Sequence, residues 1–177
     1  MQAQITINGK TNDYEFHPGT LLLEFLRDQG LHSVKYSCDT GETGCDAVLV
    51  DGKLINSGIY LAAQAHKREV ITVEYLGTPS EMHPIQEAFV ECGAIQCGYC
   101  SPAMILGAYE LLSSNLNPTE DQAREALSGV LCRCTGYVKP IEAILLAAKR
   151  LREGDRHGIA GHRQKDASAR RDEIGVR

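Results

Sequence analysis

The segments QCGYCSP (residues 96–102) and LCRCTGY (residues 131–137) hold four of the seven cysteines of this 177-residue chain. Four thiolates on two loops can bind a tetrahedral metal ion or a two-iron cluster. In zinc sites the two cysteines of a pair are usually separated by about two to four residues. Because one residue separates Cys132 from Cys134, the spacing favours an iron–sulfur site, with zinc and a reactive dithiol as the alternatives.

The residues around these cysteines predict helices. Ser101-Pro102 is typical of a helix start, with Ser101 as the cap, and this helix is expected to run to about Ser113. A helix N-terminus beside Cys100 would stabilise an anionic cluster through its free N–H groups and its dipole. Further helices are predicted over residues 84–92, from the sequence NPTE (117–120) to about residue 127, and from Lys139-Pro140 onward. Four helices in about 70 residues indicate a small bundle.

The N-terminal half has the periodicity of strands. Residues 2–8 alternate polar and apolar side chains, and Asn8-Gly9 is typical of a hairpin turn. Thr20 is expected to cap one helix that ends at Gly30. Further strands are predicted over residues 14–17, 47–50, 54–55 and 70–75, with one or two helical turns over 59–66. These elements predict an α+β fold, with a small mixed sheet around one helix.

Composition and charge divide the chain and exclude several classes of protein. The stretch 76–84 contains Gly77, Pro79 and Pro84, so we expect a linker there, between a domain over 1–76 and a helical domain over 84–152.

A net charge of −5 gives no support to a nucleic-acid partner. No apolar run approaches the roughly 18 residues of a membrane span, and the N-terminus does not resemble a secretory signal. We therefore expect a cytoplasmic protein without a membrane partner.

The C-terminal segment differs from the rest in charge. Residues 150–177 hold eight Lys/Arg against five Asp/Glu, a net of +3, whereas residues 1–149 hold ten against eighteen, a net of −8. From residue 153 to 177 the chain is charged and has little apolar periodicity. We expect a frayed tail there, or an arm that a partner orders.

The two cysteine segments closely resemble those of the small iron–sulfur subunit of molybdenum hydroxylases, the xanthine oxidase family. The resemblance to this family covers roughly residues 1–150. The resemblance implies an N-terminal plant-ferredoxin-like (β-grasp) domain followed by a four-helix-bundle [2Fe–2S] domain. By position, the proximal cluster would be ligated by Cys97, Cys100, Cys132 and Cys134. The resemblance also places Gln96 and the loop around Cys134 close to the molybdopterin of a large subunit.

The N-terminal half departs from the family's pattern. Relatives place cluster cysteines at four positions that are occupied here by Cys38, Thr43, Asp46 and Gly58, and Cys45 lies one residue before the third of them. Gly58 has no side chain to offer, and Thr43 would have to bind as an alkoxide. The favoured interpretation is a domain that keeps the fold and has lost its cluster.

The alternative for this half is a cluster or metal with unusual ligands. Cys38, Cys45 and Asp46 are its candidates, and a Rieske-like contribution from His32 or His66 is a further one. Cys92 is expected to be structural, and Tyr99 and Tyr137 are expected to be packing residues. Arg133 could face the cluster or form a salt bridge.

The resemblance implies an electron relay without a catalytic residue of its own. Molybdenum on the large subunit would hydroxylate a substrate, and electrons would pass through this chain, usually to an FAD-binding medium subunit. Flavin would sit elsewhere because this chain has no Gly-rich nucleotide fingerprint. Two alternatives remain at this point: the small subunit of a molybdenum-dependent hydratase or internally balanced variant without the distal cluster, and a stand-alone ferredoxin-like protein.

Overall fold

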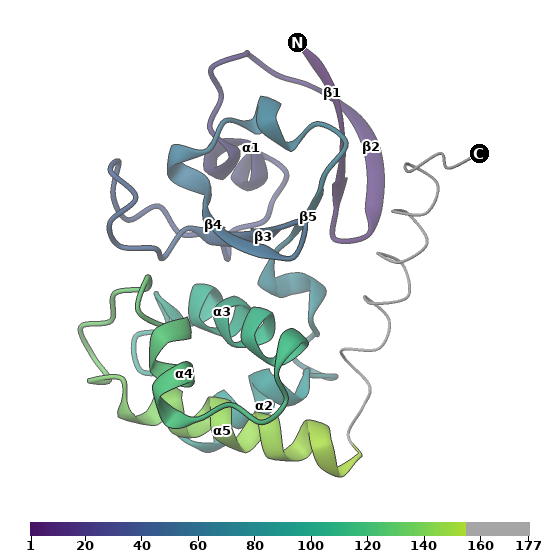
Figure 1. The fold of residues 1–177 in the computed structure, drawn as a ribbon. Helices are drawn as coiled ribbons and strands as arrows, with labels where there is room; N and C mark the ends of the chain where they lie inside the picture. The colour runs from purple at the N-terminus through teal and green to yellow at the C-terminus, as the bar shows by residue number, and fades with distance from the viewer. Residues whose placement is uncertain (155–177) are drawn as a thin grey trace.

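The computed structural model describes residues 1–154 and shows two stacked parts (Figure 1). A five-stranded sheet with helix α1 (Leu22–Asp28) forms the N-terminal part, and four helices form the other. The predicted C-terminal tail lies outside the described residues, except for Glu153 and Gly154. No helix among residues 1–154 combines the length and apolar character needed to cross a membrane.

The sheet is mixed, as the sequence predicts. Its strands are β1 (Gln2–Ile7), β2 (Lys10–Glu15), β3 (Ala47–Val50), β4 (Lys53–Asn56) and β5 (Glu69–Ile71), in the spatial order β2-β1-β5-β3-β4. β1 pairs parallel with β5, and the other neighbours are antiparallel. The β1–β2 turn has φ of 49° at Asn8 and 77° at Gly9, the two positive values that a tight hairpin of this twist requires.

Strand β3 lies between two hydrophobic cores, which explains why all four of its residues are buried. Val48 and Val50 face the core that contains α1, whereas Ala47 and Leu49 face the helical part. This alternation follows from the two-residue period of a strand. Figure 1 shows α3 (Ser101–Ser114) directly beneath the sheet, so the two parts of the chain share a continuous buried interface.

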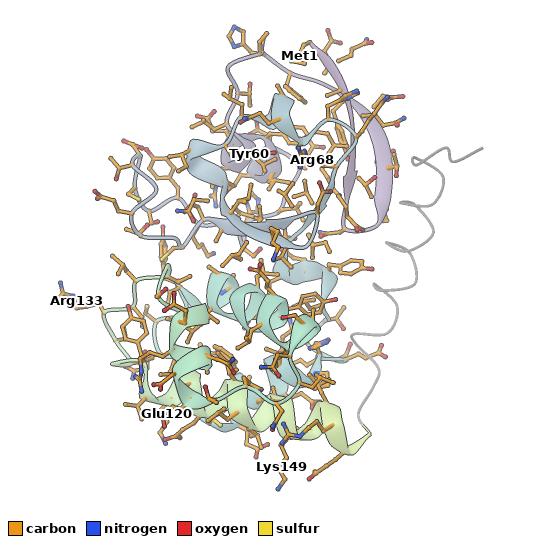
Figure 2. All side chains as sticks on the ribbon, in the orientation of Figure 1. Met1, Tyr60, Arg68, Glu120, Arg133 and Lys149 are labelled. Atoms are coloured by element: carbon orange, nitrogen blue, oxygen red, sulfur yellow. The ribbon has the colours of Figure 1, made fainter. Side chains whose placement is uncertain are left out.

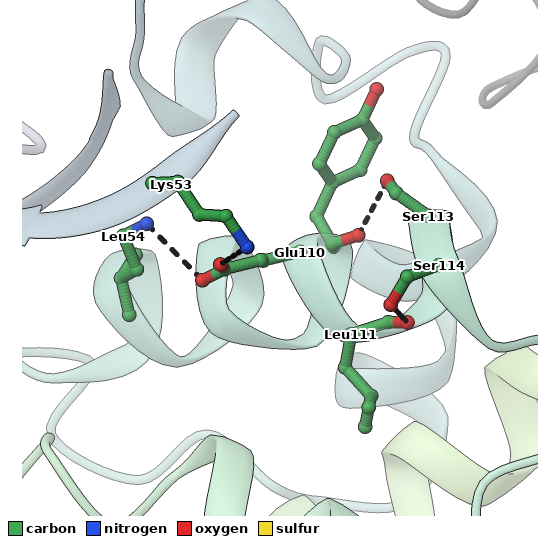
Figure 3. Close-up of polar contacts among 7 residues, drawn as sticks. Lys53, Leu54, Glu110, Leu111, Ser113 and Ser114 are labelled. Carbon is green, nitrogen blue, oxygen red and sulfur yellow. Dashed lines mark hydrogen bonds and ion pairs between the residues drawn. The ribbon is translucent and has the colours of Figure 1, made fainter. Parts of the chain in front are cut away.

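A polar contact also joins the two parts (Figure 3). The carboxylate of Glu110, on α3, accepts a hydrogen bond from the Leu54 backbone N–H at 3.1 Å and lies 3.2 Å from the Lys53 ammonium. Lys53 is exposed, and the Glu110 side chain is 29 % exposed. Glu110 therefore fixes the β4 edge of the sheet on the helical part.

The four expected C-terminal helices are present, and they are α2 (Pro84–Glu91), α3, α4 (Glu120–Ala126) and α5 (Val138–Glu153). Thr119 caps α4 by accepting from the Gln122 backbone N–H at 3.2 Å. The expected cap of α3 is wrong by one residue, because Cys100 is the N-cap and Ser101 is already helical. α5 begins at Val138, before the expected Lys139-Pro140, so Pro140 lies in its first turn. A proline is tolerated there because an N–H in the first helical turn has no intrahelical partner.

Three expectations for the N-terminal half need correction. β2 covers residues 10–15 rather than 14–17, because it pairs with all of β1 from the turn onward. The last strand ends at Ile71, and the 3-10 turn η3 (Val73–Tyr75) follows it. The N-cap of α1 is Leu21 rather than Thr20, since the Thr20 carbonyl is held in an extended pairing by the Ala62 N–H at 2.9 Å.

Candidate iron–sulfur site

Two loops of the helical part carry the four cysteines of the paired segments. Cys97 and Cys100 lie between α2 and α3, and Cys132 and Cys134 lie between α4 and α5. The structure brings the loops together, because the Cys100 thiol interacts with that of Cys132 and the Cys97 thiol with that of Cys134. Cys97 and Cys134 are exposed, whereas Cys100 is only 7 % exposed. The site therefore has a buried side and an open side.

The loop that carries Cys132 is held by two residues that follow it. The Tyr137 hydroxyl accepts from the Cys132 backbone N–H at 2.9 Å and donates to the Val130 carbonyl at 3.2 Å. The Thr135 hydroxyl lies 3.1 Å from the Cys132 sulfur and accepts from the Tyr137 N–H at 3.2 Å. The sequence interpretation treated Tyr137 as a packing residue and did not single out Thr135. Their position directly after the second cysteine pair was the available signal.

The environment sets different proton affinities for the thiols. Burial, together with the neighbouring Cys132 thiol, raises the pKa of Cys100 to about 12. Burial favours a higher pKa for Cys132, but hydrogen bonds from Thr135, the Cys134 backbone and the Cys100 thiol together outweigh burial, and its pKa falls below the ordinary thiol value. The hydrogen bond with Cys97 raises the pKa of Cys134. Binding of a metal centre by these thiols therefore releases protons, because the ligand is the thiolate.

The donor set fits a [2Fe–2S] cluster better than a single ion. Within residues 1–154, no three Cys, His, Asp or Glu side chains gather closely enough to hold one metal ion. The four thiols instead form two neighbouring pairs, and a two-iron cluster takes four thiolates over a wider span than one ion does. The N-terminal end of α3, with Cys100 at its N-cap, adds unpaired backbone N–H groups and a positive dipole end beside the site.

The open side of the site is surrounded by accessible residues. Gln96 is exposed next to Cys97. Ile95 and Leu131, in the same two loops, and Val138, the first residue of α5, are exposed apolar residues. Arg133 projects away from the body of the protein (Figure 2), so it does not bury its charge beside the thiols. Cys92, at the C-cap of α2, is partly buried and outside both loops.

The cysteine-poor loop of the N-terminal part has a different chemistry. The Thr43 hydroxyl lies 3.1 Å from the Cys38 sulfur, and hydrogen bonds from the Thr43 side chain and backbone lower the pKa of Cys38 to about 7. Asp46 is 1 % exposed, and one of its carboxylate oxygens accepts from the Gly58 N–H at 2.6 Å. Cys45 belongs to the core on the helical side of the sheet, and burial raises its pKa.

Comparison with known proteins places both halves in iron–sulfur families. Residues 72–145 match the [2Fe-2S] binding domain, and residues 5–70 match the 2Fe-2S iron-sulfur cluster binding domain. The nicotinate dehydrogenase small FeS subunit of Eubacterium barkeri is 41 % identical over 147 residues, covering 82 % of this chain and 94 % of the relative. The xanthine dehydrogenase iron-sulfur-binding subunit of Escherichia coli O157:H7 is 41 % identical over 144 residues, covering 80 % and 91 %.

A solved structure supports the same assignment. Quinoline 2-oxidoreductase from Pseudomonas putida 86 contains a chain that is 37 % identical, with a TM-score of 0.82, covering 88 % of this chain and 98 % of that one. The fold and the paired cysteine loops thus define an electron-transfer protein of the [2Fe–2S] type. The chain belongs to the family of small iron–sulfur subunits of molybdenum hydroxylases, the xanthine oxidase family. These comparisons favour neither the hydratase nor the stand-alone ferredoxin alternative.

Proposed function

We propose that this chain transfers electrons from a molybdopterin-binding large subunit through a [2Fe–2S] cluster held by Cys97, Cys100, Cys132 and Cys134. The observation that carries the proposal is the convergence of four thiols from two loops beside the N-terminus of α3. When bound, the cluster supplies one-electron redox chemistry. The helical domain over 84–152 is the cluster-bearing unit, and the domain over 1–76 packs on it through α3.

The open side of the site is the face that we assign to the large subunit. Cys97 and Cys134 are exposed there, and Gln96 is placed to hydrogen-bond to a polar group of the partner's pterin. Ile95, Leu131 and Val138 are 39 %, 54 % and 59 % exposed, so docking would bury apolar side chains around the cluster. A partner on this face would also exclude water from the exposed thiolates.

The second redox partner is proposed to be an FAD-binding subunit. This chain has no Gly-rich nucleotide fingerprint, so a flavin would be bound by another chain. The proposed assembly therefore has the present chain beside a molybdopterin subunit, with electrons leaving toward the flavin. Within this assembly the chain contributes no general base or nucleophile.

The test uses the intact complex and two cysteine variants. Cys134→Ser removes one thiolate of the proposed set, and Cys92→Ser is the matched control outside both loops. We expect Cys134→Ser to lower iron and acid-labile sulfide and to abolish or alter the [2Fe–2S] EPR signal of the dithionite-reduced complex. Cys92→Ser should retain all three. Unchanged iron and an unchanged signal in Cys134→Ser would refute the proposed ligand set.

A further inference from the structure

We propose that the N-terminal domain of this chain holds no [2Fe–2S] cluster, although residues 5–70 match a cluster-binding domain family. In this inference the loop over residues 37–46 is closed by hydrogen bonds among its own groups and the neighbouring backbone. The inference concerns a different set of residues from the four thiols of the helical-domain site, although the two loops are in contact through the Leu131 N–H and the Thr43 carbonyl.

The N-terminal domain offers too few ligands for a cluster. A [2Fe–2S] cluster takes four protein ligands, which are thiolates or, in Rieske centres, two thiolates and two imidazoles. Residues 5–70 contain two cysteines, Cys38 and Cys45. The Cys45 sulfur lies 3.7 Å from the carbonyl oxygens of Thr43 and Leu131, in the core that faces the helices. Cys45 is therefore turned toward the helical domain, and Cys38 is left as the one thiol of the loop.

Histidine does not complete the set. The Nδ1 atom of His66 accepts from the Gln4 backbone N–H at 3.1 Å, at β1, and His66 is exposed. His32 is exposed, and its backbone N–H bonds to the Gly30 carbonyl after α1. Within the described residues neither histidine hydrogen-bonds to Cys38, Cys45 or Asp46, whose side-chain contacts are with Thr43, Leu131 and Gly58. A Rieske-type set of two thiolates and two imidazoles is therefore not assembled in this loop.

Side chains of the loop and its neighbours occupy the positions where the family places cluster ligands. Cys38 and Thr43 contact each other through the sulfur and the hydroxyl, 3.1 Å apart, and the Thr43 N–H donates to the same sulfur at 3.4 Å. Asp46 fills the space next to residue 58, where a Cβ atom would lie 2.9 Å from its Oδ2 atom. The Ser57 hydroxyl donates to the Asp46 carbonyl at 2.6 Å. A side chain at residue 58 and the present Asp46 rotamer therefore exclude each other.

One atom of this region lacks a partner. The Oδ1 atom of Asp46 is buried and has no hydrogen bond within residues 1–154. Together with the Cys38 thiolate, this oxygen would supply two ligands, which is half of what a two-iron cluster takes. The orphaned oxygen consequently does not restore a cluster site.

Iron analysis of the intact complex and three variants tests the inference. We expect Cys38→Ser and Asp46→Asn to retain the iron, the acid-labile sulfide and the EPR spectrum of the unmodified complex. Cys134→Ser should lose about two iron atoms per chain, the content of one [2Fe–2S] cluster. Because each variant is compared with the unmodified complex, iron bound by other subunits cancels from the difference in iron content.

The outcomes separate this inference from the proposed function. If Cys38→Ser loses about two iron atoms together with one of two EPR signals, the inference is overturned, while the helical-domain site stands on the result for Cys134→Ser. If Cys134→Ser retains its iron and Cys38→Ser does not, both proposals fail. Retention in Cys38→Ser with loss in Cys134→Ser supports both.

Discussion

Gly44 packs against the carbonyl group of Gly129 so closely that a Cβ atom on residue 44 would lie 1.9 Å from the carbonyl oxygen. The adjacent Thr43 carbonyl accepts a hydrogen bond from the Leu131 N–H at 2.8 Å. The N-terminal loop is thus in direct backbone contact with the segment that leads to Cys132. Through these backbone contacts, the N-terminal loop supports the cysteine loop of the helical domain.

This contact predicts a large effect for Gly44→Ala. The substitution combines a positive φ of 62° with the clash at Gly129, and we expect it to lower the free energy of unfolding by about 3 kcal/mol. Iron occupancy should fall as well, because the Cys132 loop is displaced. Gly52→Ala is the control, since its φ is 77° and nothing lies within 4 Å of an added Cβ. Denaturant unfolding should show a cost of about 1–2 kcal/mol for the control; equal costs in the two variants would contradict the proposed clash.

Asp46 and Gly58 should behave as a coupled pair. Gly58→Ala places a Cβ atom 2.9 Å from the Asp46 carboxylate and should cost about 1–3 kcal/mol of unfolding free energy. Asp46→Ala leaves the buried Gly58 N–H without its acceptor and should cost a similar amount. Because Asp46→Ala also removes the clash, the double variant should be more stable than the sum predicts, by at least about 0.5 kcal/mol.

A second pair calibrates that double-mutant cycle. Asp28 is exposed in α1. The change in unfolding free energy caused by Asp28→Ala should add to that caused by Gly58→Ala within about 0.5 kcal/mol. If the Asp46 cycle were additive as well, the Asp46 carboxylate would not clash with a Cβ atom on residue 58.

The sequence predicted those features that depend on local chemistry. Asn8-Gly9 identified the first hairpin, the segment NPTE (117–120) located the start of α4, and the uninterrupted apolar run over residues 47–50 identified β3. The paired cysteine segments predicted a cluster site because their spacing is local. Contacts between distant residues were not predictable in this way. The close approach of Gly44 to Gly129 depends on how the sheet docks on α3, and no pattern around either glycine reports it.

Glu110 should stabilise the contact between the two parts mainly through the Leu54 backbone. Glu110→Ala removes the acceptor of the Leu54 N–H and should cost about 1–2 kcal/mol of unfolding free energy. Glu110→Gln retains a side-chain oxygen that can accept this bond, and Lys53→Ala removes only an exposed ion pair. Each of these controls should cost less than about 1 kcal/mol. If Lys53→Ala cost as much as Glu110→Ala, the ion pair would be the stronger contact.

His83 should make the stability of the helical part sensitive to acid. Its ring is buried against Tyr109, accepts from the Ile85 N–H at 3.2 Å, and burial lowers its pKa to about 4. Unfolding exposes a histidine of ordinary pKa, near 6.5, so the unfolded chain takes up the proton first. The contribution of His83 to the free energy of unfolding is therefore intact above about pH 6.5 and falls by up to about 3 kcal/mol as the pH drops to 4.

His83→Asn isolates this titration from that of other groups. Asparagine can still accept at the start of α2 but does not titrate, so the variant should lose less stability than the unmodified protein between pH 7 and pH 4. Denaturant unfolding at a series of pH values measures the two slopes. Parallel slopes would show that His83 is protonated in the folded protein at a pH near that of an exposed histidine.

Tyr137 should determine how firmly the cluster loop is held. Tyr137→Phe removes the acceptor of the Cys132 N–H and the donor to Val130, while the ring remains. Tyr99→Phe is the control from the other cysteine loop, because its hydroxyl donates to the Tyr36 carbonyl instead. We expect a chelator to remove iron from the Tyr137→Phe complex several-fold faster than from the Tyr99→Phe complex, since the loss of about 1 kcal/mol of hydrogen bonding changes an opening equilibrium by about fivefold. Equal rates would mean that the Cys132 loop is fixed by the thiol ligands themselves and by its contact with Thr43, and that the hydroxyl of Tyr137 serves the apoprotein alone.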